Sequence, residues 1–360
     1  MEKTIATLIE RLETDHSLSL EQYKQLIEHC DKETAAVLAE KAVAVRKRIY
    51  GKEVYTRGLI EISNYCKNDC YYCGIRRGNT KAQRYRLRPE EILDCAREGV
   101  ALGFGTIVLQ GGEDPYYTDD ILCSLIQTFR KEFPQVALTL SLGERSRDSY
   151  QRLYDAGANR YLLRHETADK EHYQKLHPKE MSFENRMRCI RDLKDIGFQT
   201  GIGFMVGSPY QSAETLAKDL KFIETFHPDM CGIGPFIAHH DTPFAACPNG
   251  TLELTCFLLS IVRLIWPPVL LPSTTALGTI DVTGREKGIL AGANVVMPNL
   301  SPENVRAKYE LYDNKVHSGA EAAQSRELLR KQMDSIDYCL VDRRGDIKLI
   351  SEGSKEHDKI

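Results

Sequence analysis

The sequence predicts an α/β fold, a closed (β/α)8 barrel of the TIM type, with helices before it and a helical extension after it. The chain has 360 residues, 42% of them hydrophobic, which is enough for one large barrel core. From residue 58 onward, short apolar runs alternate with amphipathic helical stretches. Polar or glycine-rich residues follow each run, at the strand ends where such barrels carry their chemistry.

Residues 1–50 are predicted to form helices, because charged and apolar residues alternate there at helical spacing. The barrel is expected over residues 51–300. Residues 301–360 are expected to form a helical extension that ends in a charged, mobile tail. The predicted strands of the barrel cover residues 58–63, 106–110, 136–142, 160–164, 200–206, 230–236, 269–273 and 293–297.

Composition and charge exclude several classes of protein. A net charge of −3 gives no reason to expect a nucleic-acid partner. The N-terminus has no apolar secretion signal, and the most apolar stretch, residues 254–272, contains Arg263 and two prolines and is therefore no membrane span. Eleven cysteines, an odd number, favour a reducing compartment with free or metal-bound thiols. We predict a cytoplasmic protein without nucleic-acid or membrane partners.

Cys66, Cys70 and Cys73 lie close together, directly after the first predicted strand. Thiolates are soft ligands that suit zinc or an iron–sulfur cluster. A structural zinc site takes four ligands, and no second cysteine pair follows here. Three cysteines on a 4Fe–4S cube would leave one iron open to a substrate or cofactor. The spacing favours such a cluster, with a zinc site completed by a distant His or Cys as the alternative.

This Cx3Cx2C spacing resembles that of the radical S-adenosylmethionine (SAM) superfamily, and Gly111-Gly112-Glu113 resembles the GGE element of that superfamily. The resemblance implies that Cys66, Cys70 and Cys73 are catalytic and hold a 4Fe–4S cluster whose open iron binds SAM. One electron would then cleave SAM to methionine and a 5′-deoxyadenosyl radical. By the same resemblance, Arg186 would bind the carboxylate of SAM, and Glu166 its ribose or amino group. Carried over by position, the residues implied for SAM binding are Tyr72, Gln110, Gly111, Gly112, Glu113, Ser141, Glu166, Arg186 and Met205.

Longer segments resemble the HydE family, the radical SAM maturases of FeFe hydrogenase. The matching segments, in order from about residue 50 to 315, include CKNDCYYCGIRRGN, LQGGEDPYY, YLLRHET, GIGPFIAHHDTP, PSTTALGT and YELYDNK. The resemblance implies action on a cysteine-derived iron carbonyl–cyanide precursor of the hydrogenase two-iron subcluster. It implies two companion maturases, a radical SAM tyrosine lyase and a GTPase scaffold, and a low-potential electron donor such as ferredoxin or flavodoxin. The residues that it assigns to the substrate cavity are Arg164, Thr274, Thr275, Met297, Tyr309 and Tyr312.

Some family members carry a second cluster after the YxLY segment. Here that region contains only Cys339, so one cluster is predicted and no second one. Methylornithine synthase shares the GEDPYY and GAN elements and ranks second, because its cysteine loop usually continues differently from GIRRGN. Biotin synthase, which needs a second cluster, ranks third, and a non-enzymatic metal carrier is the alternative from another class.

We interpret His239-His240-Asp241 as a hydrogen-bonded or substrate-lining loop, since adjacent histidines do not easily chelate one ion.

Overall fold

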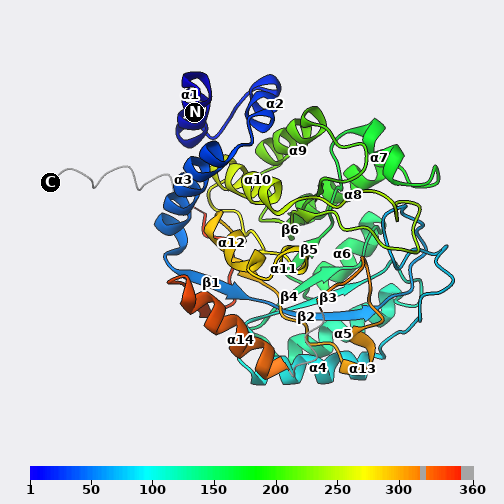
Figure 1. Ribbon diagram of the computed structural model, residues 1–360. Coiled ribbons are helices and arrows are strands. Elements are labelled where there is room, and N and C mark those ends of the chain that lie inside the picture. Colours follow the sequence, from blue (N-terminus) through cyan, green and yellow to red (C-terminus); the bar gives the residue numbers. More distant parts are fainter. Residues whose placement is uncertain (317–321, 350–360) are drawn as a thin grey trace.

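The computed structural model describes residues 1–316 and 322–349 and shows the predicted barrel, with strands at the centre and helices around them (Figure 1). Six parallel strands form its continuous sheet, in the order β2-β3-β4-β5-β6-β8. Each begins within one residue of a predicted strand. Their bounds are β2 (Gly58–Ser63), β3 (Thr106–Gly111), β4 (Ala137–Ser141), β5 (Arg160–Leu162), β6 (Gln199–Ile202) and β8 (Met230–Cys231).

The barrel closes through single bridges and not through a continuous ladder. Residues 269–273 pair only through Leu270, which bridges Met230, and Pro272, which bridges Val295 of β10 (Val295–Val296). Asn299 then bridges Leu59 of β2 and completes the circle. Proline has no backbone N–H to donate, so the predicted strand 269–273 does not form a regular ladder.

Two predicted strands are each divided in two. Residues 200–206 form β6 and β7 (Met205–Val206), and residues 230–236 form β8 and β9 (Gly234–Pro235). The first division falls at Gly203, where a Cβ atom would lie 2.0 Å from the carbonyl oxygen of Gly232. Only glycine permits this approach of the two backbones, and beyond it β7 pairs with β9 in a separate two-stranded sheet.

Two short strands were not predicted. β1 (Glu53–Thr56) pairs on one side with β10 and on the other with β11 (Cys339–Val341), and both pairings are parallel. The extension after residue 301 is therefore not purely helical. It contains α13 (Glu303–Arg306) and α14 (Ala322–Ser335), followed by β11. The predicted charged tail, residues 351–360, lies outside the described residues.

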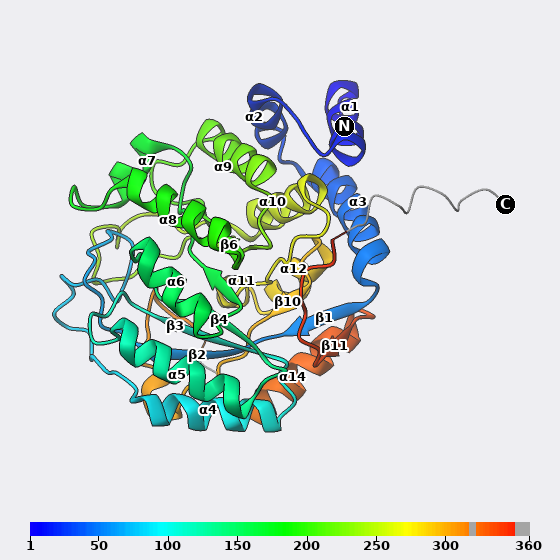
Figure 2. The ribbon, with the colours of Figure 1, turned by 180° about the vertical axis from the view of Figure 1, so that it is seen from behind.

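Helices cover the outside of the sheet in both views of the ribbon (Figures 1 and 2). Several begin after a Ser or Thr whose side chain accepts a hydrogen bond from a backbone N–H of the first turn, as Thr118, Ser182 and Thr251 do. The covering helices are α4 (Pro89–Ala101), α5 (Asp119–Glu132), α6 (Arg147–Asp155), α7 (Lys170–Leu176), α8 (Phe183–Ile196), α9 (Ala213–Phe226), α10 (Leu252–Ile265), α11 (Thr275–Ile280) and α12 (Gly284–Leu290).

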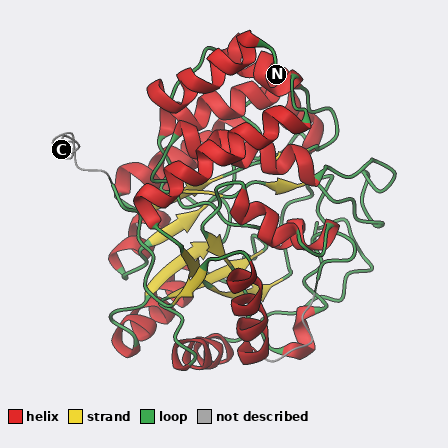
Figure 3. Cartoon of the chain, turned by 60° about the vertical axis from the view of Figure 1, so that its left-hand side comes forward, coloured by secondary structure: helices red, strands yellow, loops and turns green. Residues whose placement is uncertain are grey.

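The N-terminal helices α1 (Lys3–Asp15), α2 (Leu20–Glu28) and α3 (Lys32–Tyr50) pack on one side of the barrel, against α9 and α10. The strands lie enclosed between helices, while long loops project from one end of the barrel (Figure 3). Within the described ranges, every helix is too short or too polar to cross a lipid bilayer.

Candidate active site

All the site residues predicted from the sequence line one cavity of about 340 Å³. It lies at the carboxyl ends of the barrel strands, because its lining residues sit at or just after the ends of successive strands. The three cysteines follow β2, the GGE element ends β3, and Arg164 and Glu166 follow β5. Tyr309 and Tyr312 come from the segment after α13. This grouping is what one shared site requires, although the roles of the residues remain predictions.

The loop that carries the cysteines is held by an arginine and two glycines. The Arg84 guanidinium donates hydrogen bonds to the carbonyl oxygens of Asn64, Ile75, Arg76 and Asn79, on both sides of the cysteines. A Cβ atom on Gly112 would lie 2.2 Å from the carbonyl oxygen of Tyr65, and one on Gly74 would lie 2.2 Å from that of Glu310. Gly112 therefore permits close packing of the cysteine loop, a function that the sequence did not reveal.

The three thiols suit a cluster better than a single ion. Burial raises the pKa of Cys66 and Cys70, and raises that of Cys73 to about 12, so iron must displace the thiol protons on binding. Sulfur ligands of one tetrahedral zinc ion would lie about 3.8 Å apart. Among the described residues, the three sulfurs are not gathered within 4.8 Å of one another. This spacing is wider than the ligand shell of one zinc ion.

Buried polar atoms without hydrogen-bond partners surround the cavity. They include Oε2 of Glu113 and of Glu166, Nε and Nη2 of Arg164, and Oγ1 of Thr274. Arg164 Nη2 and Glu166 Oε2 lie 3.2 Å apart as an ion pair without hydrogen-bond geometry. Because buried polar groups are normally paired, these atoms fit a bound ligand that carries both charged and polar groups.

Glu166 has a strained backbone. Its φ of 65° lies in the left-handed region, which costs a non-glycine residue about 1–2 kcal/mol. Its N–H donates to the carbonyl oxygen of Gly203 at 3.0 Å, which fixes it beside β6. Strain of this kind persists where the surrounding structure imposes it, often at a ligand site.

Arg186 has a carboxylate partner that the sequence did not reveal. Its Nε donates to Glu144 Oε1 at 2.5 Å, and its Nη1 to the carbonyl oxygen of Arg164 at 2.7 Å. Burial opposes the charge on Arg186, but Tyr173, Glu144 and Glu113 outweigh it and raise its pKa. Arg186 is thus partly neutralised already, and it lines the cavity. The only sequence signal for Glu144 was its place in the loop after the third predicted strand.

Tyr72 is oriented by a histidine. The Nδ1–H of His177 donates to the carbonyl oxygen of Tyr173 at 2.9 Å, so His177 Nε2 accepts the hydroxyl of Tyr72 at 3.1 Å. Burial lowers the pKa of His177 to about 3, which keeps the ring neutral in this role. No motif pointed to His177.

A buried ion pair fastens the segment that carries Tyr309 and Tyr312. Lys315 Nζ donates to Glu61 Oε1 at 2.5 Å and to the carbonyl oxygen of Tyr309 at 2.8 Å. Asn299 Nδ2 donates to Glu61 Oε2 at 2.8 Å. Because Glu61 lies on β2, the pair ties this segment across the cavity to the barrel. Lys315 is the last residue of YELYDNK, but its partner had no sequence signal.

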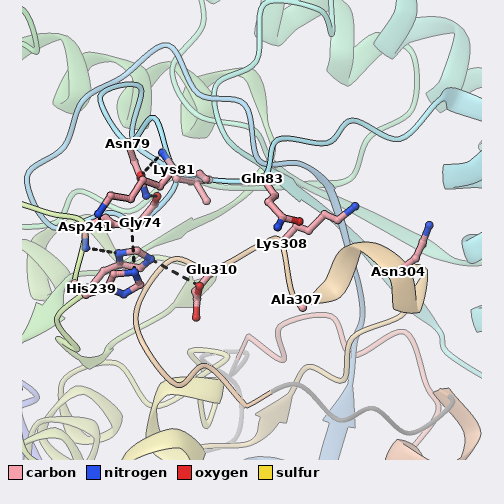
Figure 4. A pocket seen from close by; sticks show the side chains of 13 residues that line it. Gly74, Asn79, Lys81, Gln83, His239, Asp241, Asn304, Ala307, Lys308 and Glu310 are labelled. Atoms are coloured by element: carbon pink, nitrogen blue, oxygen red, sulfur yellow. Dashed lines mark hydrogen bonds and ion pairs between the residues drawn. The ribbon is translucent and has the colours of Figure 1, made fainter.

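His239 packs against Gly74 (Figure 4), and His239 and His240 both line a polar hollow of about 440 Å³. Ligand atoms of the two histidines and Asp313 lie within 4.8 Å of one another, a spacing that a metal site would need. However, His239 Nδ1 accepts the N–H of Asp241 at 3.1 Å, so the proton of the neutral ring sits on Nε2. His240 Nδ1 bonds to Asp313 at 2.6 Å. These contacts favour a hydrogen-bonded loop over a metal site.

Comparison with known proteins identifies the family. Residues 60–223 match the family model of the radical SAM superfamily. The FeFe-hydrogenase maturase subunit HydE of Thermotoga maritima is 44% identical over 86% of this chain and 88% of its own length. A 3-methylornithine synthase of Methanosarcina acetivorans is 31% identical over 75% of this chain and 76% of its own length. A crystal structure of methylornithine synthase superposes with a TM-score of 0.80 at 25% identity, over 93% of this chain and 97% of that one. The protein is therefore a radical SAM enzyme, of a superfamily that uses a 4Fe–4S cluster and SAM, and it belongs to the HydE family of maturases.

Proposed function

We propose that this protein cleaves SAM reductively and uses the resulting radical on a cysteine-derived iron carbonyl–cyanide precursor of the hydrogenase two-iron subcluster. The observation that carries the proposal is one continuous cavity that is lined by three thiols and also by threonines and tyrosines. A 4Fe–4S cluster held by Cys66, Cys70 and Cys73 would supply the electron that cleaves SAM, and the cleaved SAM would supply a 5′-deoxyadenosyl radical.

The side chains of the cavity have the chemistry for the remaining tasks. Two Arg164 nitrogens that make no hydrogen bond suit a substrate carboxylate, and the Thr274 hydroxyl, which also makes none, suits a small polar ligand. Glu113 and Glu166 each offer a carboxylate oxygen without a hydrogen-bond partner for the ribose or ammonium group of SAM. Tyr309 is buried, and Lys315 fixes its backbone, so the segment excludes water from the reacting atoms.

The proposal includes the companions of the pathway. A radical SAM tyrosine lyase would supply the iron precursor, and a GTPase scaffold would receive the product. This assignment rests on the likeness to the Thermotoga HydE, whose name places it in FeFe-hydrogenase maturation.

Anaerobic reconstitution with iron and sulfide tests the cofactor assignment. We expect about four irons per chain and the formation of 5′-deoxyadenosine when SAM and dithionite are added. Cys70→Ala should abolish both, whereas Cys123→Ala, a change at a partly buried thiol of α5, should abolish neither. One zinc ion per chain and no SAM cleavage would reject the proposal. A count near six or eight irons would contradict the prediction of a single cluster.

A second candidate is a methylornithine synthase-type reaction, favoured by the 31% identity and the TM-score of 0.80. The two candidates differ in what a deletion strain loses. If this chain is a maturase, hydrogenase stays inactive in cells that lack only this protein. Normal hydrogenase activity, together with formation of 3-methylornithine by the purified enzyme, would favour the second candidate.

A further inference from the structure

The loop that carries the cysteines has an unusual charge. Residues 65–88 contain seven Lys and Arg and one acidic residue, Asp69, whereas the whole chain has 48 Lys and Arg against 51 Asp and Glu. The inner side of this loop bears the three thiols of the cavity. Its outer side is a surface, because Tyr65, Lys67, Arg77 and Lys81 are exposed.

The ion pairs that join this loop to the rest of the barrel have the cation as the more exposed partner, whereas within the loop Asp69 is more exposed than Arg76. In three of the joining pairs the carboxylate is also buried or nearly so. The exposed side-chain fractions are 53% for Lys67 and 9% for Glu113, 76% for Lys81 and 12% for Asp241, and 32% for Arg86 and 0% for Asp114.

Ion pairs elsewhere on the surface have no common orientation. Asp120 is more exposed than Arg152, and Asp337 more than Lys52, whereas Arg147 is more exposed than Asp192. The cysteine loop differs because it contains seven Lys and Arg against one acidic residue and presents the cations of its pairs to a partner. A protein with a negative surface would be attracted to this face over the rest of the molecule.

One further cation on this face is unpaired. Arg77 is exposed and makes no ion pair within the described residues. Its backbone N–H donates to the carbonyl oxygen of Asn68 at 2.8 Å, so it is anchored to the stretch between two cysteines.

Two exposed tyrosines flank the cations. The Arg86 guanidinium lies 4.3 Å from the ring centre of Tyr65 and 4.6 Å from that of Tyr116. Tyr65 immediately precedes Cys66. Rigid tyrosine and arginine side chains are enriched in protein–protein interfaces, and the stacking holds these three in place. The polar hollow shown in Figure 4 borders the same face through Lys81.

We infer that this face docks an acidic, low-potential electron-transfer protein. We call it the basic collar and define it as Lys67, Arg77, Lys81 and Arg86 with Tyr65 and Tyr116. The inference rests on the proposed function, since only a cluster behind the loop needs an electron there. The donor gives up one electron and the cluster takes it up, with no atom transferred. Docking on the collar places the donor one loop away from the thiols, and charge attraction would raise the rate of encounter.

The test compares two reductants on the reconstituted protein. Reduced flavodoxin with an acidic surface is the protein donor, and dithionite is the small donor that needs no docking site. For the double variant Arg77→Gln/Lys81→Gln, we expect the flavodoxin-driven rate of cluster reduction to fall about tenfold or more at subsaturating flavodoxin. The dithionite-driven rate should stay unchanged. Lys131→Glu, an exposed cation in the last turn of α5, is the control for altered net charge and should change neither rate.

Binding gives a second measurement that is independent of catalysis. Flavodoxin affinity should fall with added salt for the parent protein, and the double variant should bind more weakly with a smaller salt dependence. Equal flavodoxin-driven rates for parent and double variant would overturn the inference, as would an equal loss in the Lys131→Glu control. If dithionite fails to drive SAM cleavage in the parent protein itself, the proposed function fails and not the collar. Loss of hydrogenase activation with flavodoxin-driven reduction intact would assign the collar to another partner.

Discussion

Strand β5 places an arginine near each end of the barrel, and the two arginines differ in their hydrogen bonding. Arg160, at the closed end, is fully buried and donates to Gln199, Thr106, the carbonyl oxygen of Arg344 and Asp346. Arg164, at the cavity, has two buried nitrogens without a hydrogen-bond partner. An arginine whose donors are all used stabilises the fold, whereas one with free donors is available to a ligand. The matched variants below test this division.

Arg160→Met should have the largest effect on stability. It removes the hydrogen bonds that the fully buried guanidinium donates to Thr106, Gln199 and Asp346, and a buried group left without its partner costs about 1–3 kcal/mol. We expect that loss in the free energy of unfolding by urea, while SAM cleavage per folded molecule stays unchanged. Unchanged stability would mean that the two ends of β5 do not differ as described.

Arg164→Met should have little effect on stability and a large effect on activity. It removes no side-chain hydrogen bond in the free protein, only the partly exposed ion pair with Glu166, so stability should fall by about 1 kcal/mol or less. Turnover of substrate should fall about a hundredfold, because a positioning contact is lost. The measurement is the rate of product formation beside a urea titration of the same sample. A variant that is unstable yet fully active would contradict the comparison.

Acid should lower the free energy of unfolding through His177. Burial lowers its pKa to about 3 in the folded state, while the unfolded chain keeps a value of about 6.5. As pH falls, the unfolded state binds the proton first, so the stability from the neutral ring is present above pH 6.5 and is lost between pH 6.5 and 3. We expect a loss of about 1 kcal/mol between pH 7 and 5.5. His177→Gln should reduce this slope, and an identical slope in the variant would exclude His177 as its source.

Glu166→Gly should give the smallest change in stability, and this change should be a gain. Glycine relieves the strain at φ 65° but loses more conformational entropy on folding, for a net gain of roughly 0.5–1 kcal/mol. Thermal unfolding should therefore occur at a slightly higher temperature while the affinity for SAM falls. Tyr210→Gly is the matched control, since Tyr210 has the same φ of 65° and lies outside the cavity lining. It should gain stability without weakening SAM binding.

The sequence predicted most of the barrel and the grouping of the site for the same reason. Both depend on local signals, apolar runs and the polar residues that follow them. β1 and β11 were missed because runs of four and three residues carry no readable periodicity. Within residues 269–273, Pro272 prevents the ladder that the apolar run predicts.

The missed site residues are partners and not motif residues. His177 and Tyr72 are 105 positions apart, and Lys315 and Glu61 are 254 apart. Glu144 and Arg186 are separated by 42 positions. Each contact joins separate elements of the fold, and a single sequence carries no local signal for such a pair.

The segment with Tyr309, Tyr312 and Lys315 belongs to the last sixth of the chain. During synthesis it leaves the ribosome after all the strands of the barrel and long after the cysteine loop. Until then the thiols lie open to the surrounding solution. The segment covers the cavity only after the finished polypeptide has been released. Iron therefore reaches the thiols of a nascent chain through an uncovered barrel end, and those of the completed chain only through the cavity that this segment covers.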